Sequence, residues 1–326
     1  MLKFLIIIPI LFFSRSTFGQ TCCSGGVPLS GNIGFIGEEK GLFQFELSYD
    51  YNFLNTLYFQ NQKLNDNSRK RTTQSILFKS GYNISNSFSA DLLFSYVQQE
   101  REINQFNNIN YTRTRGVGDA IVLLKYKVHG ISNFNQILLV GLGSKVPIGK
   151  SDLKTDQGIS LSADLQPGSG SYDFIYWGHF QRQFKLRPTL VVLSRIIYKQ
   201  NGKNDNYLGS QTYQFGNEFQ SLIGVGDIFY IKNLSITSGL SLRYRNTSFD
   251  KVNNVRLANT GGEWIYLAPS IGLSINSFTT LNISPELPIY TNLIGTQLST
   301  DFRLNTGLHI KLKNYKSIKT IKTIKL

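Results

Sequence analysis

Cysteine is nearly absent from this sequence, which removes several classes of site. The only cysteines among the 326 residues are Cys22 and Cys23. Two cysteines cannot supply a disulfide framework, and adjacent residues rarely bridge each other without strain. Lipid attachment at Cys22 and metal binding by the pair stay open as alternatives to the interpretation we favour, an N-terminal segment with neither role.

Catalytic patterns are lacking as well. The three histidines, His129, His179 and His309, have no metal-ligand spacing, and the carboxylates are scattered. A membrane hydrolase would need a serine, a histidine and an orienting group brought together, and no G-x-S-x-G nucleophile elbow occurs. We therefore expect a protein that is not an enzyme and that has no catalytic residues, no cofactor and no metal site.

Charged side chains are also few, at 17% of residues, whereas a soluble globular protein carries about 25%. The formal net charge of +14 falls to about +7 when Lys3 and Arg15 leave with an N-terminal leader and the five lysines of the last fourteen residues are set aside. No basic helix or basic–aromatic module accompanies this modest charge. Nucleic acid is therefore not an expected partner.

A long apolar run occurs only at the N-terminus. Leu5–Phe13 follows Lys3 and precedes the small-x-small site Thr17-Phe18-Gly19, which is the pattern of a secretory signal peptide. This run is far shorter than the ~20 residues of a spanning helix, and no later segment is long enough to be one. We predict four parts: a signal peptide (1–19), an N-terminal periplasmic segment whose residues 22–39 could plug a barrel (20–40), a transmembrane barrel (41–312) and a basic tail (313–326).

What the sequence does contain is strand-forming residues in alternating runs. It has 17 Tyr, 23 Phe and 29 Gly, which favours strands and turns over helices. Apolar and polar residues alternate with period two in twelve runs, which predicts twelve strands. The runs are 41–53, 73–83, 88–99, 116–128, 134–148, 171–182, 187–200, 212–225, 233–246, 264–276, 279–290 and 300–312.

The connections between these runs alternate in length. Short links such as 84–87 alternate with long polar ones such as 54–72, 100–115 and 149–170, which is the layout of an outer-membrane barrel. We therefore predict an all-β fold, a closed antiparallel transmembrane barrel of about twelve strands with short periplasmic turns and long extracellular loops. The alternative is a soluble β-sandwich, but its strands usually run only five or six residues.

The run GVGDAIVLLKYKV, residues 116–128, illustrates the alternation. Ala120, Val122, Leu124, Tyr126 and Val128 form a smooth face that we expect to meet lipid. The intervening residues form a mixed face that we expect to point into the barrel: Asp119, Ile121, Leu123, Lys125 and Lys127.

Pro285 and Pro288 lie inside the eleventh run. Proline cannot donate to a strand ladder and is confined to edges or bulges. A closed barrel has no edge, so we predict a local bulge or break at these residues.

Three motifs occur in order along the chain: GVGDAIVLLKYKV (116–128), ILLVGLGSKVPIGKSD (137–152) and LQPGSGSYDF (165–174). This series resembles an exported bacterial β-barrel family named for the meta-cleavage pathway of phenol degradation, over roughly 41–312. The N-terminal CCSGGVPLSGNIGF resembles the start of transporters of this kind from the Bacteroidetes group. The resemblance implies an outer-membrane location and passage of small, often hydrophobic or aromatic compounds. The tail KNYKSIKTIKTIKL departs from the family pattern, which ends at the last strand.

Charged residues on the predicted inner faces are the candidate lumen-lining residues. Buried unpaired charge is costly, so each is expected to pair across the lumen as well as to line a conduit. They are Asp91, Asp119, Lys125, Lys145, Asp173, Arg195, Glu218, Arg243, Arg245, Glu286, Arg303 and Lys311, with Lys127 a further candidate.

Bulky apolar residues also fall on the predicted inner faces: Ile121, Leu123, Leu139 and Trp177. A twelve-stranded barrel lies between the side-chain-filled eight-stranded barrels and the wide sixteen-stranded porins. We therefore expect a narrow outer-membrane channel of a Gram-negative bacterium, in contact with membrane lipid, through which small apolar or aromatic solutes diffuse. The alternative is a closed structural barrel whose long external loops bind a partner.

Overall fold

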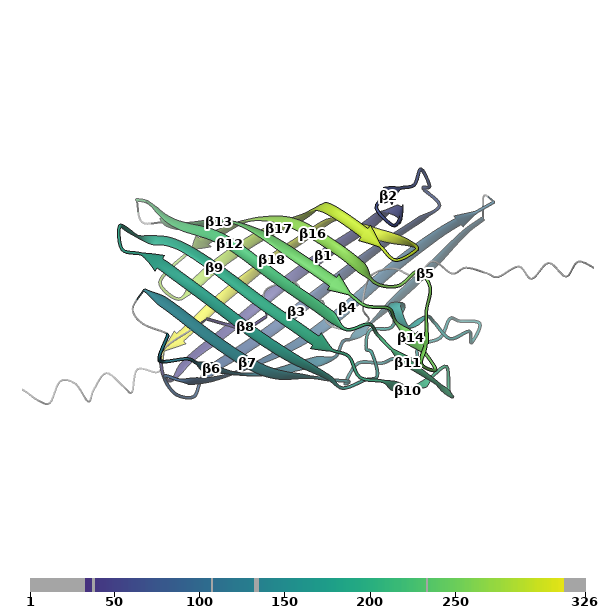
Figure 1. Ribbon diagram of the computed structural model, residues 1–326, viewed down its shortest axis with the longest axis horizontal. Coiled ribbons are helices and arrows are strands. Elements are labelled where there is room, and N and C mark those ends of the chain that lie inside the picture. Colours follow the sequence, from purple (N-terminus) through teal and green to yellow (C-terminus); the bar gives the residue numbers. More distant parts are fainter. Residues whose placement is uncertain (1–32, 37–38, 107, 132–134, 233, 314–326) are drawn as a thin grey trace, which may run out of the picture.

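A barrel built only from strands is the architecture of the computed structural model, which describes residues 33–36, 39–106, 108–131, 135–232 and 234–313 (Figure 1). Twelve antiparallel strands close when the last, β18, pairs with the first, β1. In these ranges no helix has the length and apolar character needed to cross a membrane. The barrel strands are β1 (Leu42–Phe59), β3 (Arg69–Asn83), β4 (Phe88–Gln105), β6 (Ala120–Lys127), β7 (Gln136–Val146), β8 (Asp173–Phe184), β9 (Arg187–Gln200), β12 (Glu218–Ile231), β13 (Leu234–Thr247), β16 (Gly262–Ser274), β17 (Thr279–Leu293) and β18 (Thr296–Lys313).

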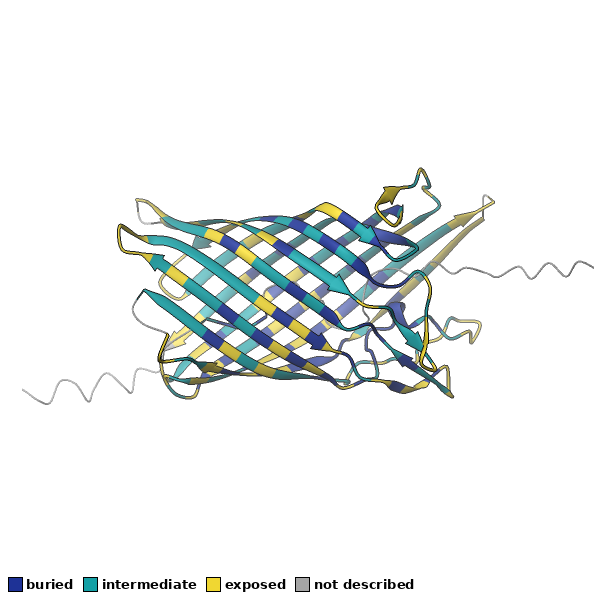
Figure 2. Ribbon diagram, viewed as in Figure 1, coloured by how far each residue is buried: buried dark blue, intermediate teal, exposed yellow. Residues whose placement is uncertain are grey.

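The period-two alternation decides which face of each strand points inward. On β6, Ile121 and Leu123 are each 1% exposed and Lys125 is 2% exposed, whereas Leu124 is 58% exposed. Buried and exposed positions alternate in the same way along most of the barrel wall (Figure 2). A closed barrel leaves no unpaired strand edge, so apolar side chains can face lipid while every backbone group is bonded in the wall. The predicted fold class is confirmed, and the burial of residues 121–127 follows the predicted faces, whereas Ala120, expected to meet lipid, is 7% exposed.

The two ends of the barrel differ. Links of two to four residues, at 84–87, 185–186 and 275–278, lie at what we call the turn end. At the opposite end, the loop end, β17 and β18 are joined by residues 294–295 alone, but the other connections between barrel strands are long (Figure 1). These carry short elements of their own: β2 (Gln62–Lys63), β5 (Asn108–Val117), β10 (Asn204–Tyr207), β11 (Gln211–Gln214), β14 (Lys251–Val252), β15 (Val255–Arg256) and the 3-10 turn η1 (Ala163–Leu165).

Several predicted boundaries are wrong. The predicted loop 54–72 is shorter, because β1 continues to Phe59 and β3 starts at Arg69. The predicted loop 100–115 is instead the paired hairpin of β4 and β5. The polar sequence of this hairpin does not show the alternation by which strands are predicted. Beyond the lipid-facing band both faces of a strand can meet water, so neither face has to be apolar. The predicted strand 212–225 is in fact two elements: residues 211–214 form β11 of a separate four-stranded sheet, and the barrel strand starts at Glu218.

The prolines of β17 interrupt its ladder with β16, as predicted. The register shifts between Ile265–Tyr290 and Tyr266–Pro288, and after Leu267–Leu287 the ladder resumes only at Ile271–Ile283. Proline has no N–H to donate to the neighbouring strand, so Pro288 lies where the register shifts and the regular ladder hydrogen bonds are already interrupted.

Candidate functional site: the filled barrel interior

Residues 161–171, in the connection between β7 and β8, fold into the loop end of the barrel. The Arg71 Nη1 atom on β3 donates to Asp164 Oδ2 at 2.7 Å, and the Arg71 side chain is fully buried. The Thr114 hydroxyl on β5 donates to the Leu165 carbonyl oxygen at 2.7 Å. The Gln99 side-chain Nε2 atom on β4 donates to the Gln166 carbonyl oxygen at 3.4 Å, so three strands of the wall and its extension hold the connection inside.

A buried charge cluster anchors the same connection where the three sequence motifs meet. The Lys145 ammonium lies 3.1 Å from Asp119 Oδ2 and 2.7 Å from Asp173 Oδ2. The Ser169 hydroxyl donates to Asp119 Oδ2 at 2.7 Å and accepts a hydrogen bond from Lys145. The Ser171 hydroxyl donates to Asp173 Oδ1 at 2.9 Å. Three of the sequence-predicted residues, Asp119, Lys145 and Asp173, are therefore in one network.

The glycines of these motifs allow the close approach. A Cβ atom added to Gly149 would lie 2.8 Å from the Gly168 Cα atom, and one added to Gly168 would lie 2.4 Å from the Gly149 carbonyl oxygen. Two backbones in such contact leave no room for any side chain. The K-x-P-x-G and P-G-S-G motifs therefore serve to dock the connection on the wall.

The N-terminal residues 33–36 occupy the interior nearer the turn end. The Trp177 indole N–H donates to the Ile33 carbonyl oxygen at 2.9 Å. The Phe35 N–H donates to Asp91 Oδ2 at 2.9 Å, and the Lys125 ammonium donates to the Phe35 carbonyl oxygen at 2.5 Å and lies 2.6 Å from the same carboxylate. A short peptide thus has its backbone groups bonded by three side chains of the wall.

This peptide covers an apolar sector of the interior wall. The residues of this sector face inward from β3, β4 and β6 to β9, and Ile33 of the peptide packs against them. They are Leu77, Leu93, Ile121, Leu123, Leu139, Ile175, Trp177 and Ile197. The four inward apolar residues expected from the sequence all lie in this sector.

Ion pairs line much of the remaining interior. Arg243 Nε donates to Glu286 Oε1 at 3.1 Å. Glu218 accepts from Arg245 Nε at 3.1 Å and lies 3.8 Å from the Lys199 ammonium. The described pairs also include Lys79–Glu46 and Arg303–Asp50.

The other predicted residues have different surroundings. The Arg195 guanidinium carbon lies 5.9 Å from the ring centre of Trp177. Lys127 is half-buried near the turn end. Lys311 is exposed at the end of β18, unlike the remaining eleven candidates.

The sequence reasoning missed six interior partners: Glu46, Asp50, Arg71, Lys79, Asp164 and Lys199. Period-two alternation alone would have found Glu46, Asp50, Lys79 and Lys199, which fall on the inner faces of predicted strands.

A small sheet of β10, β11, β14 and β15, separate from the barrel sheet, lies at the loop end and packs against Ala163 of the connection (Figure 1). Beside it, the Tyr213 hydroxyl donates to Asp250 Oδ2 at 2.6 Å and the Gly216 N–H donates to Asp250 Oδ1 at 2.7 Å. Burial raises the pKa of Asp250 to about 6, although both hydrogen bonds oppose the rise. Burial, with the nearby Asp250 carboxylate, also raises the pKa of Tyr213. This sheet therefore holds a carboxyl group that titrates near neutral pH.

The described residues contain one serine–histidine contact that could be considered for catalysis. The Ser87 hydroxyl lies 2.6 Å from His129 Nε2, in an exposed turn. Within the described ranges, no hydrogen bond joins the other His129 nitrogen to a carboxylate, so the orienting member of a triad is missing there. Those ranges also contain no group of three or more potential metal ligands.

Neither a family model nor a curated protein matches the chain. Among solved structures, the COG4313 outer membrane channel from Pseudomonas putida F1 is similar, with a TM-score of 0.63 and 13% identity over 87% of this chain and 99% of that one. The transport unit of the autotransporter AIDA-I from Escherichia coli has a TM-score of 0.49 and 12% identity, covering 87% and 94% of the two chains. The P. putida toluene transporter TodX has a TM-score of 0.42 and 9% identity, covering 84% and 90%. The first similarity shows a shared barrel fold, and the resemblance to the phenol meta-cleavage family stays a prediction.

Proposed function

We propose that this chain is exported by its N-terminal signal, spans the outer membrane of a Gram-negative bacterium and passes small apolar or aromatic solutes by passive diffusion. The turn end then faces the periplasm and the loop end faces outward. The observation that carries the proposal is the apolar sector inside the barrel, from Leu77 to Ile197. These inward apolar side chains give an apolar solute a favourable path along the inner wall. They provide no polar groups that could replace the water around an ion.

Two segments obstruct the barrel interior at different levels. Residues 33–36 cover the apolar sector, and residues 161–171 fill the loop end. The described part of this inner closure is residues 33–36, and three side chains of the wall bond to its backbone. Passage therefore requires this short peptide to leave the wall, so the segment 22–39 acts as a plug.

Purified protein in liposomes, offered a panel of aromatic and charged solutes, tests the proposal. We expect faster uptake of aromatic than of charged solutes, and faster uptake still when residues 22–39 are deleted. Replacing Leu123, at the centre of the sector, by Asn should slow aromatic uptake, whereas the matched Leu123→Met should not. Absence of permeation by any solute, with or without residues 22–39, would remove the transport function.

The second candidate is a closed structural barrel whose loops bind an external partner. It is favoured by the interior ion pairs, because eight inward carboxylates among the described residues each lie in a salt bridge, so none of these eight is free to guide a cation. Failure of permeation in both the full chain and the deletion variant would select this candidate.

A further inference from the structure

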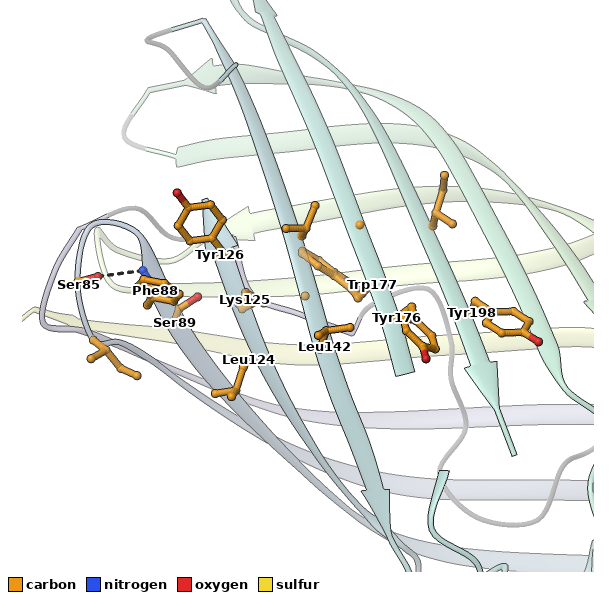
Figure 3. Close-up of a pocket in the computed structure, with 15 residues that line it drawn as sticks. Ser85, Phe88, Ser89, Leu124, Lys125, Tyr126, Leu142, Tyr176, Trp177 and Tyr198 are labelled. Carbon is orange, nitrogen blue, oxygen red and sulfur yellow. Dashed lines mark hydrogen bonds between the residues drawn. The ribbon is translucent and has the colours of Figure 1, made fainter. Parts of the chain in front are cut away.

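An apolar groove of about 1090 Å³ lies on the outward face of the wall, across β4, β6, β7, β8 and β9 (Figure 3). It is distinct from the interior described above, because most of its walls are the lipid-facing side chains of these strands. Ser85 and Phe88 lie at one end and Tyr198 at the other (Figure 3).

The strand register explains the groove. Residues paired across neighbouring strands form rows that run perpendicular to the strands. One outward row forms the first side of the groove: Phe88, Tyr126, Val140, Gly178 and Ile196. A second outward row forms the other side: Leu124, Leu142, Tyr176 and Tyr198. The row between them points inward and leaves its backbone as the floor: Ser89, Lys125, Gly141 and Trp177.

Gly178 leaves a gap in the first row, because it has no side chain. It is flanked across the ladder by Val140 and Ile196, which are 43% and 50% exposed. A Cβ atom added to Gly178 would meet no atom within 4 Å. The glycine is therefore not required by packing within the barrel, and any side chain placed there would project into the groove.

The groove is long and narrow. It crosses four strand-to-strand spacings, which together span roughly 19 Å. Barrel strands are tilted by about 35–45°, so rows perpendicular to them are inclined in the membrane rather than parallel to its surface. An extended alkyl chain fits along this length with room beside it, whereas a small aromatic molecule would fill only part of the groove.

The turn end of the groove offers polar and basic groups. Ser85 lines it, and the neighbouring Ser87 hydroxyl contacts His129 Nε2 at 2.6 Å. The Lys40 N–H donates to the Asn86 side-chain oxygen at 3.3 Å, which places this exposed lysine at the same turn. Tyr126, in the first row, lies edge-on to His129. Aromatic rings beside basic groups are typical of the level where lipid headgroups lie.

We propose that the groove is a specific binding site for one acyl chain of a phospholipid in the periplasmic leaflet, whose phosphate lies beside His129 and Lys40. This inference rests on the membrane orientation proposed above, but not on solute passage. The occupant is a phospholipid rather than a free alkyl solute because the apolar groove ends at the Ser85 hydroxyl, beside the turn that holds Ser87, His129 and Lys40, whose side chains can donate to a phosphate.

Trp177 provides a readout across the thickness of the wall, because the chain has only two tryptophans and the backbone of Trp177 forms part of the floor while its indole lies directly behind it, on the inner side. In a Trp264→Phe background, vesicles of phospholipid with brominated acyl chains should quench Trp177 fluorescence. Gly178→Leu fills the groove and should reduce this quenching at least twofold. Val225→Phe adds similar bulk to an outward position on β12 and should leave it unchanged. Equal quenching in the Gly178→Leu and parent proteins would overturn the proposal.

Native mass spectrometry of the full chain with both tryptophans intact provides a second measurement, in case Trp264→Phe does not fold. Titration with phosphatidylglycerol should give one tightest-bound lipid, and Gly178→Leu should weaken its binding about tenfold. His129→Ala with Lys40→Ala should weaken it less, and only for lipids with a phosphate. Retention of the lipid by Gly178→Leu, or its displacement by dodecane at equal concentration, would overturn the phospholipid assignment. If the groove binds lipid but the liposomes pass no solute, only the proposed function fails.

Discussion

Asp50 on β1 and Arg303 on β18 form an ion pair across the seam where the barrel closes. The Arg303 Nε atom donates to Asp50 Oδ1 at 3.1 Å and to Oδ2 at 3.0 Å, and the carboxylate side chain is 1% exposed. The two residues are 253 positions apart in the sequence. The first and last strands are thus joined by a buried charge pair as well as by their ladder.

Asp50→Asn should weaken the seam. It leaves a buried guanidinium without its carboxylate, and removing one partner of a buried pair costs about 3–5 kcal/mol. We expect the free energy of unfolding, measured by urea titration of protein in lipid vesicles, to fall by that order. The double variant Asp50→Asn with Arg303→Met is the control, because removing both charges should cost less than removing one. A double variant as unstable as the sum of the single variants would show that the pair is not coupled.

Arg71→Met should release the connection at the loop end. Arg71 bonds to Asp164 and to Gln99, so its loss removes the main tie between residues 161–171 and β3. We expect protease to cleave within 149–170 at least tenfold faster, while the barrel strands stay resistant. Exchange of exposed Lys70, the next residue, for Met provides the control. An unchanged cleavage rate in Arg71→Met would mean that the contacts of Thr114 and Ser169 hold the connection by themselves.

Lys145→Met should have a larger effect than Arg71→Met on the same connection. One ammonium serves both Asp119 and Asp173 and also bonds to Ser169. Its removal leaves two buried carboxylates without a cation, and buried uncompensated charge is strongly destabilising. Hydrogen exchange of residues 167–171 should rise in this variant. Adding Asp119→Asn to Lys145→Met should restore part of the protection; no restoration would contradict the assigned role of the charge.

The small sheet at the loop end should lose stability as pH rises. The pKa of Asp250 is raised from an ordinary 3.8 to about 6, chiefly by burial. The folded sheet therefore binds this proton more tightly than the opened sheet, so the stabilisation is full below pH 4 and is lost as pH rises through 6. The neighbouring groups that act on Asp250 include Tyr213, Asp164 and Lys199.

Hydrogen exchange of residues 211–214 and 251–252 measures this dependence. Protection should fall between pH 4 and pH 7, by at most roughly a hundredfold, because a difference of two between the pKa values limits the change. Asp250→Asn should flatten the profile. A profile in the parent protein that is flat, or that rises with pH, would rule out Asp250 as the titrating group.

The barrel itself follows from a local property of the chain. A strand between lipid and interior must alternate, so each strand carries its own signal, as Leu124 and Lys125 do on β6. The same signal predicted inward positions for Asp91, Lys125 and Lys145, which are buried in the structure. It failed at residues 100–115 and 212–217, because outside the lipid-facing band neither face has to be apolar.

The sequence by itself therefore determined the all-β fold, its inner and outer faces and the bulge near Pro288. Only the tertiary structure decided what fills the barrel. Asp164 lies in a polar connection and Arg71 in a basic run, 93 positions apart, and neither has a pattern that points to the other. Residues 33–36 likewise show no periodicity before they meet Asp91, Lys125 and Trp177. Such contacts depend on backbone groups and single side chains brought together by closure of the wall, so no local pattern encodes them.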